Sequence, residues 1–419
     1  MDNKIIRAKM SCRLCRSRRL DTVLDLGSTA LANEYLSSDA YPQEVYPLRL
    51  KQCSSCGHVQ LAHVVNKEIL FDNYSYVSGT SPSFVEHFSL YATEALEIVD
   101  RFHGVDLGAS VAVLEIGSND GTLLAEYKKR GCVVCGVEPA ANLVKQCVEI
   151  GLRVEQSYFN KAIVDKFLAN NEQFDIITAN NVMAHIDDLD AIFNGVTKLL
   201  SKDGFFVFEV SYLPTVIEKL LFDTIYHEHV DYHHIRPLTT YLERFGLRIF
   251  NAKEVSTHGG SIRIYVAHME SPLKPTGSLE KLISNEAVES QSFAQMALRL
   301  ERAKKLFQDT LRDLKMQRFG RLIAYGVPAK FTTFSYQFDL NKDQVSNAID
   351  DSPLKQNRFT PGKLLPIKSI ADACIVNDDI VLISAWNFSK EITAKLNSLY
   401  NGKGLRVVVP LPELQVITL

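Results

Sequence analysis

The chain has 419 residues, of which 46% are hydrophobic and 23% are charged, a composition typical of a folded protein with two or three domains. Its formal net charge is -3, and its Lys and Arg residues do not gather on one periodic face, so nucleic acid is a weak candidate partner. No apolar run reaches the roughly 18 to 20 residues that span a bilayer, and the first residues lack the apolar core of a signal peptide; we expect a cytoplasmic protein without a membrane partner.

Residues 1–68 carry two CxxC pairs among short strand-like stretches. In a reducing compartment, eight cysteines are better explained as metal ligands or buried apolar residues than as disulfides. Each CxxC turn places two sulfurs on one side of a metal, and four thiolates complete a tetrahedral, structural Zn²⁺ site whose binding energy helps a small domain to fold. Iron in place of zinc, or four unligated thiols, are the alternatives. The predicted ligands are Cys12, Cys15, Cys53 and Cys56, and the cysteines predicted to lie in the core are Cys132, Cys135, Cys147 and Cys374.

From residue 69 the pattern changes to longer periodic segments, beginning with a predicted helix over 84–102. Strand-like and helical stretches then alternate, which predicts a parallel sheet with crossover helices and hence an α/β, Rossmann-like domain over 69–275. A helical connector rich in Glu, Leu, Ala, Lys and Arg follows, and the alternation then restarts. We therefore predict a second Rossmann-like α/β domain, connector included, over 276–419.

The first strand of the central domain ends in the sequence EIGSNDG, immediately before a predicted helix. Its two glycines allow a tight turn and a close approach of the backbone to a ligand. The loop is not a GxGxxG fingerprint; it resembles the ExGxxxG loop on which methyltransferases hold the methionine part of S-adenosylmethionine (SAM). An acidic residue ends the next strand, where it can accept hydrogen bonds from ribose hydroxyls. A generic turn with a capping Glu is the alternative. The candidate SAM-binding residues are Glu115, Gly117, Asn119, Gly121, Glu138, Pro139 and Asn180.

A segment dense in Tyr, His and Glu follows the strand GFFVFEV, beyond the carboxyl end of the sheet, where open α/β folds bind ligands. Tyr226, Glu228 and His229 can supply a general base with its orienting partner, because a histidine beside a carboxylate has a pKa suited to proton removal near neutrality. HEH does not have the HExxH spacing of zinc hydrolases, and solvated histidines are the simpler alternative. Asn181 and His185 follow the strand FDIITAN at the same edge, as pocket residues or as helix caps.

In the last domain, a turn at Gly326 followed by a helix offers free backbone amides to a pyrophosphate, and nearby cations can add charge-assisted bonds. A plain turn with surface cations is the alternative. His258 and Arg263 can face the substrate, although Arg263 lies in an alternating strand and can equally point to solvent. The candidate substrate-binding residues are His258, Arg263, Lys330, Lys355 and Arg358.

Several independent motifs occur in one order along the whole chain: the two CxxC pairs, YSYVSGTS, EIGSNDGTLL, GVEPA, NNVMAHIDDL, DTIYHEH, HGGSIRIYV, YGVPAKFTTF, DDSPLKQNRFTPG and ISAWNF. In this the chain resembles the family of sugar C-methyltransferases that act on nucleotide-linked keto-deoxysugars in antibiotic and surface-polysaccharide pathways. The resemblance implies a zinc-binding domain, a central SAM domain and a C-terminal domain that helps to hold a nucleotide-diphosphate sugar. We expect a monomer or a homodimer.

The resemblance also implies a reaction, methylation at carbon 3 of a 4-keto-6-deoxyhexose. By position in the matching motifs, His229 would remove the proton next to the ketone, with Glu228 and Tyr226 orienting it or binding the sugar. The catalytic pocket would also contain Tyr76, Asn181 and His185, and the enolate oxygen would take a hydrogen bond from Tyr226 or His185. Two other hypotheses stay open: a SAM-dependent methyltransferase of another substrate class, RNA or a small molecule, and a non-catalytic scaffold.

Overall fold

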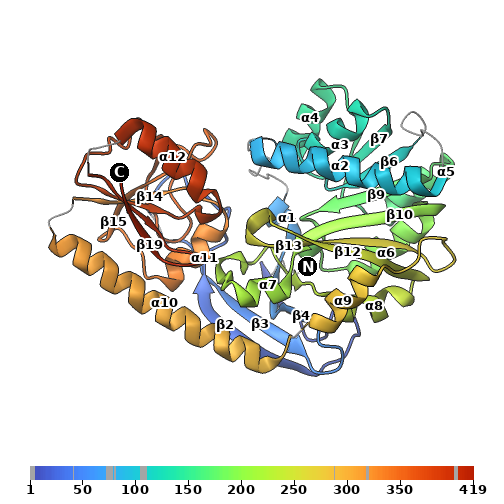
Figure 1. Ribbon diagram of the computed structural model, residues 1–419, viewed down its shortest axis with the longest axis horizontal. Coiled ribbons are helices and arrows are strands. Elements are labelled where there is room, and N and C mark those ends of the chain that lie inside the picture. Colours follow the sequence, from blue (N-terminus) through green and yellow to red (C-terminus); the bar gives the residue numbers. More distant parts are fainter. Residues whose placement is uncertain are drawn as a thin grey trace.

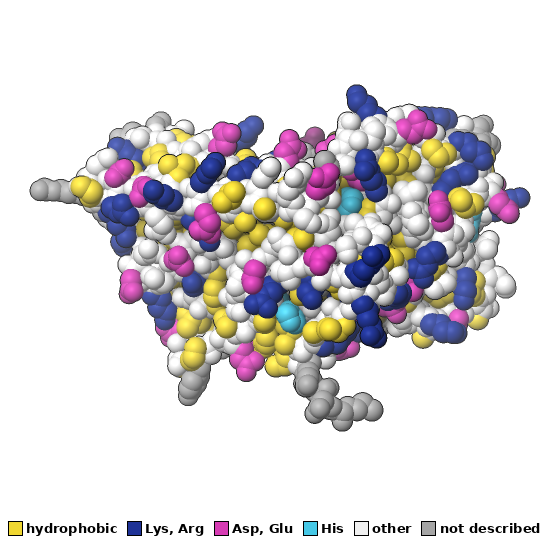
Figure 2. Space-filling view, turned by 90° about the horizontal axis from the view of Figure 1, so that it is seen from below, with side chains coloured by type: hydrophobic (Ala, Val, Ile, Leu, Met, Phe, Trp, Pro, Cys, Tyr) yellow, Lys and Arg dark blue, Asp and Glu magenta, His cyan; other side chains and the backbone are white. Residues whose placement is uncertain are grey.

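The computed structural model describes residues 5–40, 42–71, 79, 82–103, 111–286, 288–317, 320–400 and 404–419. Two α/β sheets with their helices stand apart in Figure 1, and the ribbon of β2 and β3 and the long helix α10 run beneath both and connect them. Among the described residues, no helix is long and apolar enough to cross a membrane. On the face seen in Figure 2, basic and acidic side chains are interspersed and neither sign forms a patch.

The central sheet has seven strands and confirms the predicted Rossmann-like α/β fold. β6 lies between β9 and β7 and is parallel to both, while β13 is antiparallel to β10 and β12. The chain therefore reverses its direction of progress across the sheet at β6 and β9, where open α/β sheets bind ligands. In spatial order the strands are β12 (Leu247–Val255), β13 (Ser261–His268), β10 (Leu200–Ser211), β9 (Phe174–Asn180), β6 (Ala112–Ile116), β7 (Val133–Glu138) and β8 (Val154–Gln156).

Helices cover both faces of this sheet, and the central strands are accordingly mostly apolar; in β10 every residue from Phe205 to Val210 is buried. The predicted helix over 84–102 is α2 (Pro82–His103), and the helix predicted from Thr122 is α3 (Thr122–Lys129). The other helices here are α4 (Ala141–Glu149), α5 (Lys161–Ala169), α6 (Leu189–Leu199), α7 (Leu213–Glu218), α8 (Ile235–Glu243) and α9 (Gly277–Asn285), with short 3₁₀ turns η2 (Met183–His185), η3 (Phe222–Thr224) and η4 (Thr257–Gly259).

The N-terminal module consists of a short strand pair and a four-stranded sheet. One strand of that sheet, β11, comes from the His-rich segment, so the module and the central domain share a sheet. This pairing holds the His-rich segment against the cysteine-bearing module. The pair is β1 (Ile6–Ala8) with β5 (His63–Val65), the sheet is β11 (Asp231–Tyr232), β4 (Val59–Leu61), β3 (Tyr46–Cys53) and β2 (Leu20–Thr29), and α1 (Lys67–Phe71) follows.

The C-terminal domain has a six-stranded sheet that is parallel except for its last strand. The predicted connector is α10 (Ser290–Met316), whose apolar face enters one hydrophobic core with the C-terminal sheet and the N-terminal ribbon. Cys374 was predicted to lie in the core; it is exposed, because it belongs to the turn before β17. The strands are β16 (Ile367–Lys368), β15 (Val345–Ile349), β14 (Leu322–Tyr325), β17 (Ile380–Ile383), β18 (Arg406–Val409) and β19 (Gln415–Thr418), with helices α11 (Lys330–Gln337), η5 (Trp386–Phe388) and α12 (Ser389–Tyr400).

Candidate active site

A cavity of about 1330 Å³ opens at the carboxyl ends of the central strands and extends to the C-terminal domain. Its lining includes Gly117 after β6, Pro139 after β7, His229 of the His-rich segment, Asn33 of the N-terminal module and Lys355 after β15. Pockets for one small ligand usually measure about 300 to 1,000 Å³. The cavity is therefore large enough for two ligands, and all three parts of the chain build it.

Glu138 ends β7 inside this cavity, as predicted for the SAM-binding acid. One carboxylate oxygen accepts the amide of Asn119 at 3.0 Å and the other accepts the amide of Ala140 at 2.9 Å. Burial raises the pKa of Glu138, but these two amide bonds favour its ionised form. Each oxygen keeps a lone pair, so the carboxylate can accept the two hydroxyls of a ribose.

Glu115 and Asn180 lie in the same cavity at the ends of β6 and β9. Oε2 of Glu115 and Oδ1 of Asn180 are buried acceptors without a hydrogen-bond partner among the described residues. Buried polar atoms normally have partners, and an ammonium group such as that of the methionine part of SAM would supply donors here. Both residues fit the predicted cofactor.

The two loop glycines have different tasks. Gly117 lines the cavity with φ of 68°, whereas Gly121 is not among the lining residues. A Cβ on Gly121 would lie 2.4 Å from Leu152 and 3.0 Å from Cys147, so this glycine allows α3 to pack closely on its neighbour. Its contact with the cofactor stays a prediction.

His229 and Tyr226 form a hydrogen-bonded pair in the cavity. Nδ1 of His229 donates to the Thr224 carbonyl at 2.8 Å, and Nε2 accepts from the Tyr226 hydroxyl at 2.9 Å. Burial lowers the pKa of His229 to about 4, so the imidazole is neutral at physiological pH and Nε2 carries its lone pair.

Glu228 does not orient His229, contrary to the prediction. Its carboxylate is buried away from the cavity and accepts a hydrogen bond from Asn33 at 2.6 Å. The Thr224 carbonyl holds His229 instead. Burial lowers the pKa of this histidine, and the bond to the Thr224 carbonyl offsets only part of that lowering. No sequence pattern indicated that Asn33 would bind Glu228 or that the Thr224 carbonyl would bind His229.

Asn181, His185 and His258 are brought together around His229 in the cavity. The ring of His185 lies 4.9 Å from that of His229, edge to face, and burial lowers the pKa of His185 well below its ordinary value. Nδ2 of Asn181 lies 3.4 Å from Nε2 of His258. Both Asn181 and His258 have positive φ, 55° and 54°, a strained backbone that clusters at functional sites.

Arg263 contacts neither the cavity nor solvent, so both interpretations of it were wrong. It is buried on β13, with Nη2 3.0 Å from Glu209 and Nη1 2.7 Å from Glu94. Burial disfavours the Glu209 carboxylate, but His87 and Arg263 outweigh this and lower its pKa to about 2. The alternation of β13 could not reveal this ion pair, because both acids come from distant elements.

The C-terminal candidates are divided. Lys330 and Lys355 line the cavity, whereas Arg358 is exposed and is not among the lining residues. The prediction that the Gly326 turn offers free backbone amides is wrong for the first two residues of the turn. Gly326 donates to the Ile349 carbonyl at 2.7 Å, and Val327 donates to Asp350 at 2.8 Å.

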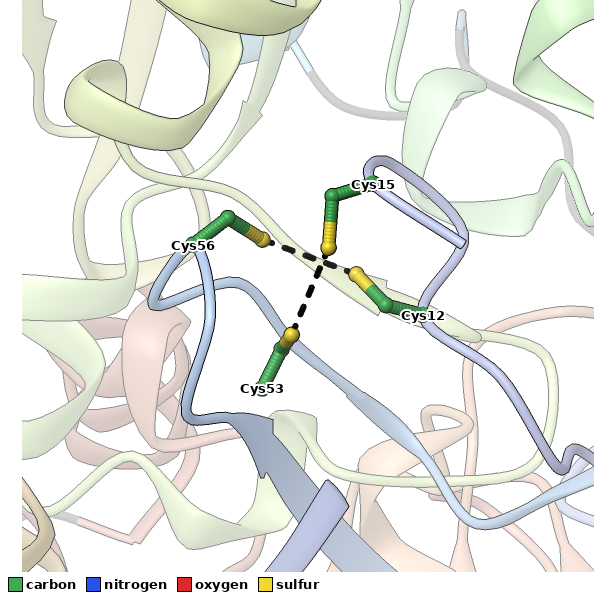
Figure 3. Close-up of side chains that lie close together, drawn as sticks. All are labelled: Cys12, Cys15, Cys53 and Cys56. Carbon is green, nitrogen blue, oxygen red and sulfur yellow. Dashed lines mark hydrogen bonds between the residues drawn. The ribbon is translucent and has the colours of Figure 1, made fainter. Parts of the chain in front are cut away.

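The four predicted ligand cysteines lie together, with all sulfurs within 4.8 Å of one another (Figure 3). Cys12 lies 3.6 Å from Cys56 and Cys15 lies 3.5 Å from Cys53, sulfur to sulfur. Zn–S bonds of about 2.3 Å in a tetrahedron place the sulfurs about 3.8 Å apart. The cluster therefore fits a four-thiolate zinc site without an open position.

A buried arginine between the first two cysteines joins the module to the active site. Nε of Arg13 lies 3.0 Å from the Asp187 carboxylate, which also pairs with Arg7 and with Lys9 at 2.8 Å. Asp187 follows His185 and lines the cavity. The module is thus fixed to the loop that carries a pocket histidine. The predicted pocket residue Tyr76 lies outside the described residues.

Family models match the chain in three consecutive pieces: a zinc binding domain at 12–71, a methyltransferase domain at 87–251 and a C-methyltransferase C-terminal domain at 256–412. The ubiquinone biosynthesis O-methyltransferase of Pasteurella multocida (strain Pm70) is 26% identical over 110 residues, 23% of this chain and 44% of that protein. Among solved structures, the magnesium protoporphyrin IX methyltransferase (ChlM) of Synechocystis PCC 6803 with bound SAH shares 12% identity at a TM-score of 0.34, over 42% of this chain and 83% of that one.

The C-methyltransferase NovU of Streptomyces niveus is 30% identical over 421 residues, which cover 99% of this chain and 98% of that protein. Since this likeness runs the full length of both chains, the protein belongs to the family of SAM-dependent C-methyltransferases.

Proposed function

We propose that this C-methyltransferase acts on a nucleotide-diphosphate 4-keto-6-deoxysugar and transfers the methyl group to carbon 3. One observation carries the proposal: a neutral, oriented histidine lies in the same cavity as the loop after β6 and as Lys330 and Lys355 of the C-terminal domain. A ketone acidifies the neighbouring C–H bond, so a proton acceptor beside a methyl donor is what C-methylation requires.

The cofactor side of the cavity is built by the loop after β6 and by Glu138. Glu138 would hold the ribose hydroxyls, and Glu115 and Asn180 would accept the ammonium group. SAM supplies an electrophilic methyl group whose bond electrons remain on sulfur after transfer. The protein's task is to form a carbanion equivalent within reach of that methyl group.

His229 is the proposed proton acceptor. Its Nδ1–H is committed to the Thr224 carbonyl, so the incoming proton goes to Nε2, and the carbonyl stabilises the resulting imidazolium. Tyr226 has one hydroxyl hydrogen; when that hydrogen forms a hydrogen bond to the ketone oxygen, without proton transfer, Nε2 of His229 becomes available. The C–H electron pair then forms the carbon–carbon double bond of an enolate, and the carbonyl π pair moves to oxygen.

The C-terminal domain would hold the nucleotide end of the substrate, with Lys355 at the cavity wall. The zinc cluster has no open position, so its proposed role is structural. Asn181, His185 and His258 would surround the sugar. The proposed parts of the molecule are a zinc domain over 1–68, a SAM domain over 69–275 and the remainder over 276–419.

The test is an assay with SAM and a thymidine- or guanosine-diphospho-4-keto-6-deoxysugar in deuterium oxide, followed by mass spectrometry. We expect a methylated product from the wild type and a loss of methylation and of deuterium exchange by about 10²- to 10⁴-fold in His229→Ala. His227→Asn is the matched control, because His227 is a buried neighbour that does not line the cavity. A wild type that binds SAM but neither exchanges nor methylates any such sugar would contradict the proposed substrate.

A further inference from the structure

Lys330 is the first residue of α11, and its side chain lines the cavity although the residue is only 7% exposed. Its Nζ is buried and has no hydrogen-bond or ion-pair partner in the part of the chain that the structure describes. Burying an unpaired ammonium is costly, so such a group persists where a ligand completes its surroundings. Lys330 therefore points to a negatively charged or strongly polarised ligand atom.

The groups around Lys330 fix its position. Its Nζ lies 4.2 Å from the centre of the Trp386 ring, a cation–π contact. Trp386 donates from Nε1 to Asp223 at 2.6 Å, and its ring packs on Gly259, where an added Cβ would lie 2.5 Å from the ring. Gly259 follows the cavity residue His258. Lys330 thus lies where the C-terminal domain meets the turn that carries a pocket histidine.

Lys355, another lysine of this cavity, provides a contrast. Its Nζ donates to the Val327 carbonyl at 2.9 Å and pairs with Asp350 at 3.1 Å. Lys355 therefore has an ion-pair partner within the protein, whereas Lys330 has none within ion-pair distance among the described residues. Asp223 is a nearby countercharge, but it forms no ion pair with Lys330 and is bound to Trp386.

The charge of Lys330 is felt at the proposed reaction centre. Burial lowers the pKa of His229 to about 4 and that of His258 to about 3, and in both cases the charge of Lys330 contributes to the lowering. All three side chains line the same cavity. A diphosphate would be expected farther from the proton acceptor than the sugar ring that it carries.

We propose that the Lys330 ammonium stabilises the negative charge that develops on the ketone oxygen of the substrate while His229 takes the neighbouring proton. This inference rests on the proposed function. In the step, the C–H pair becomes the C=C bond of the enolate, the C=O π pair moves to oxygen beside Nζ, and the proton moves to Nε2 of His229. Lys330 keeps all its protons and forms no covalent bond.

The experiment compares Lys330→Met, Lys330→Gln and Lys330→Arg with the wild type in the deuterium-exchange and methylation assay. Loss of one preorganised charge donor typically costs about 10²- to 10³-fold in rate. We expect that loss in the exchange rate and kcat of the Met and Gln variants, a KM for the nucleotide sugar within about threefold of wild type, and partial recovery in Lys330→Arg. SAM affinity, measured on each variant, reports whether the fold is retained.

Lys355→Met is the matched control, a lysine of the same cavity and domain whose charge is already paired; we expect it to raise KM more than it lowers kcat. Binding of thymidine or guanosine diphosphate alone should be unchanged in Lys330→Met. Weakened diphosphate binding with an unchanged exchange rate would overturn the inference and make Lys330 a phosphate ligand. Borohydride trapping of the sugar on Lys330 would also overturn it, because the amine would then be a nucleophile. A wild type without exchange would overturn the proposed function itself.

Discussion

The two α/β sheets use the same hydrogen-bonded construction at the end of their first strand. After β6, Gly117 donates to the Val137 carbonyl and Asn119 donates to Glu138; after β14, Gly326 donates to the Ile349 carbonyl and Val327 donates to Asp350. Each acid also accepts the amide two residues later, Ala140 at 2.9 Å or Ser352 at 2.9 Å. Each acid ends or follows the second strand of its sheet.

The two sites differ in what neutralises the acid. Asp350 pairs with Lys355, whereas no cation pairs with Glu138 among the described residues. A free carboxylate can accept ribose hydroxyls, and a paired one is largely occupied. The same backbone scaffold therefore leaves an acid open for the proposed cofactor in one sheet and is an internal support in the other, and one lysine makes the difference.

Asp350→Ala should give the largest effect on folding. It removes the acid but leaves the Lys355 ammonium largely buried, and breaking such a pair costs about 3 to 5 kcal/mol of unfolding free energy. Denaturant unfolding measures this loss of unfolding free energy. The double variant with Lys355→Met should recover part of the loss, because the unpaired charge is gone; no recovery would mean that the acid acts through its two amides alone.

Glu138→Ala should act on binding instead. Two ribose hydroxyls donating to a carboxylate contribute about 3 kcal/mol together, so the Kd for SAM should rise by about 100-fold. Isothermal titration gives the value, and Asp350→Ala is the comparison, with an expected Kd for SAM close to wild type. Equal losses of SAM affinity in the two variants would contradict the division of roles between the two sheets.

The features that the sequence predicted correctly are local. The alternation of strands and helices, the acid that follows the glycine loop by about twenty residues, and the paired cysteines all depend on spacing along the chain. The features that it missed depend on distant partners: Arg263 meets Glu94 and Glu209, and Glu228 meets Asn33. No local pattern encodes such contacts.

The Gly326 turn illustrates the same limit. A glycine turn between a strand and a helix predicts open amides, but whether they are open depends on the next strand, whose acid, Asp350, claims one of them. In the central sheet the equivalent acid was recognised because it resembled a known motif. The difference between the two sheets depends on the ion pair of Lys355 with Asp350, which no local pattern predicts.

Alanine at the two turn glycines should have smaller effects. One substitution should mainly lower the unfolding free energy, and the other should mainly weaken SAM binding. Both glycines have positive φ, 68° at Gly117 and 90° at Gly326, which costs an L-residue about 1 to 2 kcal/mol. A Cβ on Gly117 would meet the Val182 side chain, which can move, whereas one on Gly326 would lie 2.3 Å from Ala385 Cβ and 3.1 Å from its backbone nitrogen. Gly326→Ala should therefore lower the unfolding free energy more, and Gly117→Ala should weaken SAM binding more, as thermal unfolding and titration would measure.

The histidines should make the central sheet less stable to acid than the C-terminal sheet. All 11 precede residue 276, and burial lowers the pKa of His227 and His229 to about 4 and that of His258 to about 3. Because these values lie below the unfolded value of about 6.5, the unfolded chain binds more protons, and stability is lost as pH falls from about 6.5 toward 4.

Each such histidine contributes about 1.4 kcal/mol of this loss between pH 7.5 and 5.5, so His227→Asn should reduce the pH dependence of the unfolding free energy by that amount. Hydrogen exchange at the two pH values, corrected for the intrinsic rate, should show protection falling in β6, β9 and β10 before it falls in β14 and β17. Simultaneous loss of protection in both sheets would mean that the shared core around α10 couples them into one cooperative unit. The difference in charged groups between the two sheets would then govern ligand binding but not the order of unfolding.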